Sequence, residues 1–132
     1  MPVRKGRNRM VIRIDFGSDE ALYVQLYNQI IYGIAHAQLL PGDSLPSVRE
    51  LAEDIGINMH TVNKAYAILR QEGYLRLDRR NGAVIAVNSD KLRAMEHLKN
   101  EMRISLAKAL CRGLSAEEIH QVTDEVLREF RV

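Results

Sequence analysis

Two short helical patterns lie at the centre of the chain, separated only by Gly56, Ile57 and Asn58. The first opens with Ser47 and Glu50, the S-x-x-E capping box of a helix N-terminus. Apolar residues then recur at helical spacing, first as Val48, Leu51, Ala52 and Ile55 and then as Val62, Ala65, Tyr66 and Leu69. Each helix is therefore expected to bury one face, and two helices joined by so short a turn are typical of a helix-turn-helix.

The second helical pattern has an exposed polar side. Asn58 is a good N-cap for it, and Gly73 offers a left-handed stop. The side opposite the apolar residues carries Met59, His60, Thr61, Asn63 and Lys64. Helices presented in this way enter the major groove of DNA.

A β-hairpin is predicted directly after these helices, over residues 74–78 and 83–87. Asn81-Gly82 is a strong turn signal because both residues tolerate positive φ. The alternation of Leu75 and Leu77 indicates a strand with one buried face. The hairpin tip carries Arg79 and Arg80. A helix-turn-helix followed by a basic-tipped hairpin indicates a winged helix, whose wing meets the DNA backbone or minor groove.

Three runs of residues in this region form a recognisable set: ALY at 21–23, LPGDSLPSVRELA at 40–52 and TVNKAY at 61–66. Together they make residues 20–87 resemble the GntR family of bacterial transcription regulators. The recognition-helix run and the short helical tail look most like the YtrA subfamily. That resemblance implies a two-helix dimerisation region in place of a large ligand-binding domain.

The resemblance also implies which residues contact DNA. The matching positions, with the two wing arginines added from their charge, are Ser47, Arg49, Asn58, Met59, His60, Thr61, Asn63, Lys64, Arg79, Arg80 and Gly82. Many family members have arginine at the positions of Met59 and Asn63, which puts guanine readout in doubt here. Asn63 can pair with adenine instead. For His60, the alternative is an exposed histidine without a chemical role.

Arg49 is the strongest candidate for a phosphate contact. Pro41-Gly42 is expected to end a helix over residues 21–40, and Pro46 restricts the backbone just before the next helix begins. Arg49 is thereby held near a helix N-terminus, where backbone N–H groups and the helix dipole also favour an anion. The alternative is a surface ion pair with Glu53, four residues further on.

The ends of the chain differ in charge and pattern. The 132 residues carry a net charge of only +2, but basic residues cluster near the start at Arg4, Lys5, Arg7, Arg9 and Arg13. We expect residues 1–20 to form a basic arm with a short strand over 11–16, where apolar and polar residues alternate. The arm can follow a DNA backbone; a solvated tail or a cloning remnant is the alternative.

Residues 89–132 are predicted to form a helical hairpin after the winged helix-turn-helix of residues 21–88. Ser89 or Asp90 can cap the first helix, Gly113 ends it, and Ser115 with Glu118 forms a second capping box. Its apolar positions are Leu92, Met95, Leu98, Met102, Leu106, Ile119, Val122, Val126 and Phe130. A two-helix unit cannot hide them alone, so we expect a homodimer. The alternative is that both helices fold back on the winged helix.

These features define the expected fold and function. The fold class is mainly α with a small β-hairpin. The expected function is a homodimeric transcriptional repressor that binds a palindromic operator in double-stranded DNA. The alternative is a winged-helix module that binds protein.

Enzymatic activity, a cofactor and a metal site are not expected, because the sequence has neither a catalytic motif nor residues at the spacing of metal ligands. No membrane span or signal peptide is recognised, so a cytoplasmic location is expected.

The single cysteine, Cys111, is expected to be packed against other side chains, with redox sensing as the alternative. A small-molecule effector would have to bind between subunits or between tail and head.

Overall fold

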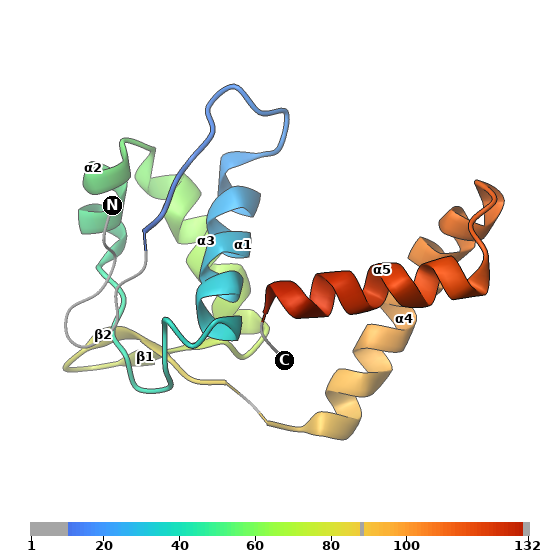
Figure 1. Cartoon of the computed structure of the whole chain (residues 1–132). Helices are drawn as coiled ribbons and strands as arrows, with labels where there is room; N and C mark the ends of the chain where they lie inside the picture. Colours follow the sequence, from blue (N-terminus) through green and yellow to red (C-terminus); the bar gives the residue numbers. More distant parts are fainter. Residues whose placement is uncertain (1–10, 88, 131–132) are drawn as a thin grey trace. The chain divides into compact units, whose positions relative to one another are not determined.

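The computed structural model describes residues 11–87 and 89–130 (Figure 1). The elements are α1 (Leu22–Ala35), α2 (Val48–Ile55), α3 (Met59–Gln71), β1 (Leu75–Asp78), β2 (Gly82–Ile85), α4 (Lys91–Cys111) and α5 (Ala116–Glu129). The chain divides into two units, with the boundary between Asn88 and Ser89. We call residues 11–87 the head and residues 89–130 the tail.

The helix-turn-helix at the centre of the head has the predicted local geometry. Ser47 Oγ accepts a hydrogen bond from the backbone N–H of Glu50 at 3.1 Å, and the Glu50 carboxylate accepts one from the N–H of Ser47 at 3.3 Å. Gly56 ends α2 in the left-handed conformation, with φ of 73°. Asn58 then caps α3 by accepting from the N–H of His60 at 2.7 Å. The capping box, turn and N-cap predicted from the sequence are confirmed.

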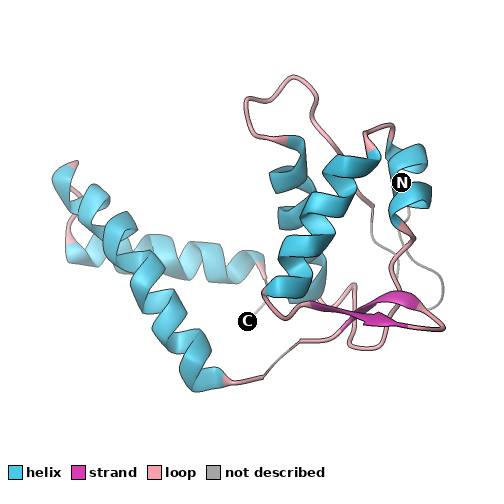
Figure 2. Cartoon of the chain, turned by 180° about the vertical axis from the view of Figure 1, so that it is seen from behind, coloured by secondary structure: helices cyan, strands magenta, loops and turns pink. Residues whose placement is uncertain are grey.

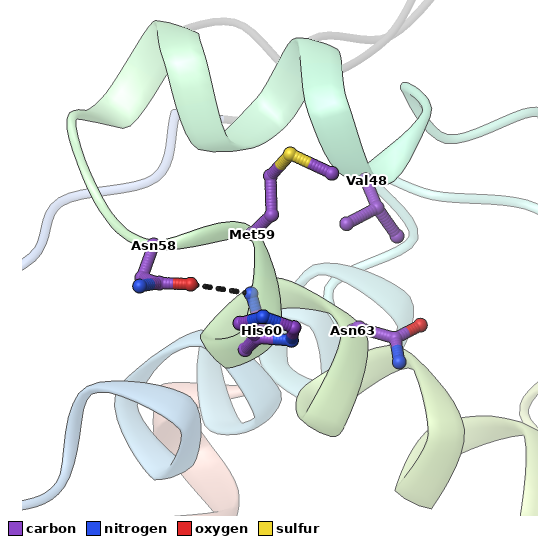
Figure 3. Close-up of a pocket in the computed structure, with 5 residues that line it drawn as sticks. All are labelled: Val48, Asn58, Met59, His60 and Asn63. Atoms are coloured by element: carbon purple, nitrogen blue, oxygen red, sulfur yellow. Dashed lines mark hydrogen bonds between the residues drawn. The ribbon is translucent and has the colours of Figure 1, made fainter.

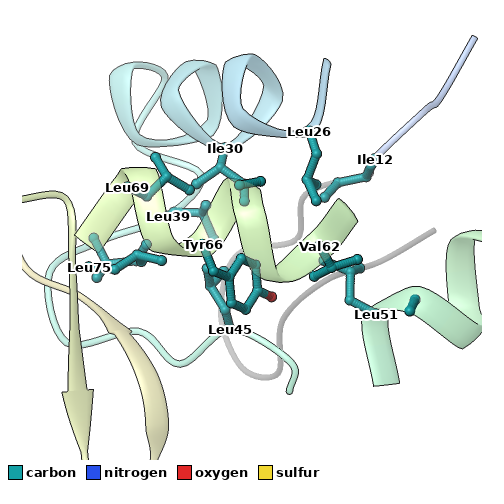
Figure 4. Close-up of a cluster of buried hydrophobic side chains, with 13 residues drawn as sticks. Ile12, Leu26, Ile30, Leu39, Leu45, Leu51, Val62, Tyr66, Leu69 and Leu75 are labelled. Carbon is teal, nitrogen blue, oxygen red and sulfur yellow. The ribbon is translucent and has the colours of Figure 1, made fainter. Parts of the chain in front are cut away.

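The head has a continuous apolar core (Figure 4). α3 packs on both α1 and α2, and the hairpin follows directly from α3. The largest fully buried side chains come from the three helices, the α1–α2 connection and the second strand: Leu26, Ile30, Leu39, Leu51, Val62, Leu69, Val84 and Ile85. Tyr23 and Tyr27 of α1 are partly buried and pack against the edge of this core.

The first helix is shorter than the sequence predicted. It ends at Ala35 and not near Leu40, because Ala37 takes a left-handed conformation with φ of 58°. The N–H groups of Gln38 and Leu39 both donate to the carbonyl of Gly33, at 2.8 and 3.0 Å. This turn directs Leu39 into the core, where it is fully buried. The helix therefore stops before Pro41 can interrupt it.

The segment before α1 is not the predicted strand. Val11 takes part in a single β-bridge, and residues 12–16 have no strand structure. Two glutamine side chains of α1 satisfy the backbone there. Gln29 exchanges hydrogen bonds with the N–H and carbonyl of Arg13, and Gln25 does the same with Asp15 at 2.8 and 3.0 Å. These amides replace a neighbouring strand. The first ten residues of the predicted arm over 1–20 lie outside the described residues.

The predicted wing is present as an antiparallel pair of strands, seen from behind in Figure 2. The pairing runs from Leu75 opposite Ile85 to Asp78 opposite Gly82. Two details of the prediction were wrong. Gly82 has positive φ, 70°, but Asn81 does not. Leu77 is 66% exposed, although Leu75 is buried, because it lies one pair from the tip and opposite the small Ala83.

The tail consists of two capped helices. Asp90 Oδ1 accepts from the N–H of Arg93 at 3.2 Å to start α4. Ser115 and Glu118 form the predicted capping box of α5, with N–O distances of 2.9 and 3.1 Å. The two helices meet at their turn and separate away from it (Figures 1 and 2). Cys111 is exposed, so the expectation that it is packed is wrong for this chain alone.

None of the predicted dimerisation residues is fully buried. Leu92, Met95, Leu98, Val122 and Val126 are each 46% exposed or more. Those that are partly buried are Met102, Leu106, Ile119 and Phe130. No residue of either tail helix falls in the buried class over the described residues. Within residues 11–87 and 89–130, no helix combines the length and apolar character that crossing a membrane requires.

Candidate nucleic-acid interface

The two sides of α3 differ in exposure as the sequence predicted. Its inward side carries Val62, Ala65, Tyr66 and Leu69, all buried. On the other side, Met59, His60, Asn63 and Lys64 are exposed, and Thr61 is partly buried. The buried residues fix α3 on the core, so the exposed side chains at its N-terminal end are held on a rigid element.

An open hollow lies at this N-terminal end (Figure 3). It is lined by Val48, Asn58, Met59, His60 and Asn63. Met59 and Asn63 are one helical turn apart on α3, and the Met59 side chain reaches towards Val48 of α2. Val48 was missing from the predicted site because its spacing placed it on the buried face of α2. Nothing in the sequence signalled that the first turn of α2 borders the start of α3, because that depends on how the two helices pack.

Arg49 is exposed in the first turn of α2. Among the residues that the structure describes, no ion pair joins it to Glu53, so the alternative considered for Arg49 is not observed. Its position beside the N-terminal N–H groups of α2 is the one that an anion would share.

The loop that leads into α2 is fixed by Tyr66. The Tyr66 hydroxyl donates a hydrogen bond to the carbonyl of Pro46 at 2.8 Å. Burial raises the pKa of the Tyr66 phenol well above its ordinary value, and the nearby Glu50 carboxylate raises it further. The phenol is therefore a neutral donor that holds the residues just before Ser47 and Arg49. The sequence pattern assigned Tyr66 to the core but gave no sign of this bond.

Lys64 is paired with an aromatic ring of α1. Its Nζ lies 3.9 Å from the centroid of the Tyr23 ring, a cation–π contact. The contact restrains the long lysine side chain on the side of α3 that faces α1. The ammonium is therefore not among the groups that line the hollow.

The tip of the wing is held by Asp78. Its Oδ1 accepts hydrogen bonds from the N–H groups of Arg80 and Asn81, at 2.8 and 3.3 Å, and its Oδ2 lies 3.4 Å from Nη1 of Arg76. The backbone hydrogen bond from Arg80 is the main reason that the pKa of Asp78 lies below its usual range, followed by the one from Asn81. The side chains of Arg79 and Arg80 are exposed at this ordered tip.

The predicted site residues thus fall into three groups on the head. Ser47 and Arg49 begin α2, the residues from Asn58 to Lys64 begin α3, and Arg79, Arg80 and Gly82 belong to the wing. Ser47 and Asn58 also cap their helices. In the described part of the chain, no group of three or more His, Cys, Asp or Glu side chains is arranged to hold a metal ion.

Comparison with known proteins gives a consistent match. The model of the family described as bacterial regulatory proteins, gntR family, matches residues 22–85. The HTH-type transcriptional repressor YtrA of Bacillus subtilis is 33% identical over 124 residues, covering 92% of this chain and 95% of YtrA.

Solved structures resemble the chain in fold as well. YtrA from Sulfolobus acidocaldarius, described as a GntR-family transcription factor, is 39% identical, with a TM-score of 0.65 over 76% of this chain and 97% of that one. A transcriptional antiterminator from Listeria monocytogenes EGD-e is 27% identical, with a TM-score of 0.79 over 91% and 92%. The alignment with YtrA of Bacillus subtilis covers 92% of this chain, so the similarity includes the tail as well as the head.

Proposed function

The chain belongs to the gntR family of bacterial regulatory proteins, and on this premise we propose that it is a homodimeric repressor that binds a palindromic DNA operator. Its winged helix-turn-helix is the fold of a DNA-binding transcription regulator, and its similarity to YtrA agrees with the subfamily that the sequence predicted.

One observation carries the proposal: the exposed N-terminal end of α3 is flanked by exposed basic groups on the same rigid head. Arg49 lies at the start of α2, and Arg79 and Arg80 lie at the wing tip. In winged helices the recognition helix reads base edges in the major groove, while groups around it contact the backbone. Arg49 and the wing arginines are assigned here to phosphates, and Asn63 with its neighbours to bases.

The tail supports the assignment of a dimer. Its helices carry large apolar side chains that are mostly exposed in the single chain, and a second tail can cover them. Two heads related by a twofold axis require two inverted half-sites, about 10 base pairs apart or a multiple of that distance. The Bacillus relative is named a repressor, and we extend that role to this chain.

The proposal is tested by titrating the purified full chain against fluorescent duplexes from upstream of its own operon, over a series of salt concentrations. Arg49→Ala is expected to weaken binding by about tenfold or more, since charged hydrogen bonds are lost. It should also lower the salt dependence by about one ion for each lost phosphate contact, or about two per dimer. Arg112→Ala, an exposed arginine at the end of α4, is the matched control and should bind normally.

Two results would contradict the proposal. Binding that shows no preference for the operon duplex over a scrambled duplex would leave the winged helix as a protein-interaction module. A wild-type chain that stays monomeric during sedimentation at the concentrations used for binding would rule out the dimer. If binding is specific and dimeric but Arg49→Ala behaves like Arg112→Ala, only the assignment of Arg49 is wrong.

A further inference from the structure

The hollow at the start of α3 combines an apolar wall with a carboxamide. Met59 is 44% exposed, and its side chain reaches towards the half-buried Val48, so a thioether and an isopropyl group are directed into the same space (Figure 3). Asn63 borders that space from one turn further along α3. No side chain of lysine, arginine, aspartate or glutamate lines it.

Two polar groups at the start of α3 already have partners within the head. The Oδ1 of Asn58 is already used to cap α3, and the ammonium of Lys64 is held over the Tyr23 ring. The polar groups left to face a base are the Asn63 carboxamide, the His60 imidazole and the Nδ2 of Asn58. None of them is the bidentate cation that most often reads guanine.

The chemistry of the major groove matches this set of groups to one kind of base pair. Adenine presents an acceptor and a donor that a carboxamide can engage with two hydrogen bonds. Thymine presents its 5-methyl group, which needs an apolar partner. A guanine or cytosine placed against Val48 and Met59 would lose hydration there without gaining a hydrogen bond.

Resting on the proposed function, we propose that Met59 and Val48 form a docking point for the 5-methyl group of a thymine, and that Asn63 reads an adjacent adenine. Met59 is then a specificity-determining residue, although it has no group that makes a strong hydrogen bond. Each operator half-site contains A·T pairs at the position where this hollow meets the groove.

The test changes the DNA and leaves the protein intact. A library of random duplexes is first enriched for binding to the purified full chain, and the enriched sequence is synthesised with single thymines replaced by deoxyuridine, which lacks only the methyl group. Wild type is expected to bind the deoxyuridine duplex about fourfold more weakly for each methyl removed, or about fifteenfold when both half-sites are changed.

A variant then assigns the effect to the hollow. In Met59→Ala the difference between the thymine and deoxyuridine duplexes should be clearly smaller than in wild type, because only Val48 is left as an apolar partner. Phe16→Ala is the matched control: Phe16 is 64% exposed and lies outside the hollow, so this variant should keep the wild-type discrimination. Circular dichroism checks that both variants keep their helices. Val48→Ala provides a second test of the same wall.

The outcomes separate this inference from the proposed function. An enriched half-site in which no thymine is sensitive to deoxyuridine would overturn the inference while leaving a specific regulator. The same holds if the sensitivity persists unchanged in both Met59→Ala and Val48→Ala. A library that yields no enriched sequence would overturn both the inference and the proposed function.

Discussion

The head and the tail have the same kind of helix-capping signal, but they differ in whether their helices bury a core. Both contain a capping box, with Ser47 and Glu50 in the head and Ser115 and Glu118 in the tail, and in both the N–H to Oγ distance is 3.1 Å. The head buries side chains from its helices and strands in one core, whereas neither tail helix has a buried residue. Local signals therefore define helices, and only the head has a core of its own.

This difference has an energetic consequence. Isolated helices of the length of α5 are marginal in water, because ordering their backbone costs more than their own hydrogen bonds return. In the head, core burial offsets that cost. In the tail, the apolar burial that offsets this cost must come from a surface outside the two helices. In the proposed function, that surface is the tail of a second copy.

The largest effect is expected from a cavity in the head core. Leu69 is fully buried in α3, and Leu69→Ala should lower the free energy of unfolding by about 3 kcal/mol, through lost apolar burial and the cavity left behind. Urea denaturation measures this effect. The tail counterpart is Ile104→Ala, at a side chain that is 60% exposed, which should change stability by about 0.5 kcal/mol or less. Equal losses in the two variants would break the comparison.

The second prediction concerns the apolar stripe of α4. Leu98→Glu should raise the dimer dissociation constant by about 30-fold or more, as for a central interface residue, because a charge would be buried between the tails. Sedimentation equilibrium measures it, and the head should keep its unfolding transition. Ile104→Glu is the control, since Ile104 lies about 120° around the helix from Leu98. If the two variants dissociate equally, the predicted stripe is not the interface.

The third prediction concerns the hydrogen bond from Tyr66 to Pro46. Tyr66→Phe should cost about 1 kcal/mol of stability near neutral pH, because the Pro46 carbonyl loses its donor. A pH dependence sharpens the test. The pKa of Tyr66 is raised in the folded chain, so its contribution is fully present below the ordinary tyrosine pKa of about 10 and is lost as the pH rises above it.

Urea denaturation at neutral and alkaline pH follows this effect. Wild type should lose more stability than Tyr66→Phe as the pH rises, because only wild type has this phenol to deprotonate on unfolding. Parallel curves for wild type and Tyr66→Phe would mean that the phenol titrates alike in the folded and unfolded chains.

The sequence predicted those features that depend on neighbours along the chain. Helical periodicity and caps located α2, α3 and α5, and the resulting orientation of α3 placed Met59, His60 and Asn63 on its exposed side. The Asn81-Gly82 pair located the wing turn, in which Gly82 has the positive φ. Each of these signals lies within a few residues of the structure that it specifies.

The features that were missed depend on contacts between distant segments. The glutamine amides of α1 that bind the segment before it, and the left-handed Ala37 that turns Leu39 into the core, follow from tertiary packing. So does the contact of Lys64 with Tyr23, and so does the position of Val48 at the hollow. A periodic pattern assigns a residue to one face of its own helix, but it does not say which other element borders that face.

The smallest effect is expected at the wing tip. This part of the head resembles the tail, because it is ordered by local hydrogen bonds and not by a core. Asp78→Ala removes the acceptor for the N–H groups of Arg80 and Asn81, so their hydrogen-exchange protection should fall while the unfolding midpoint falls only slightly. Asp78→Asn keeps an acceptor oxygen and should lose less protection.

The titration of Asp78 tests the same tip without a mutation. Because its pKa is lowered in the folded chain, its stabilising effect is present above the ordinary aspartate pKa of about 3.9 and is lost as the pH falls through the lower folded value. Carboxyl NMR should therefore find Asp78 titrating below the ordinary aspartate range. If Asp78 instead titrates at the ordinary aspartate value, the two backbone hydrogen bonds do not order the tip in solution. The wing would then resemble the tail in depending on a partner for its structure, and that partner would be the DNA itself.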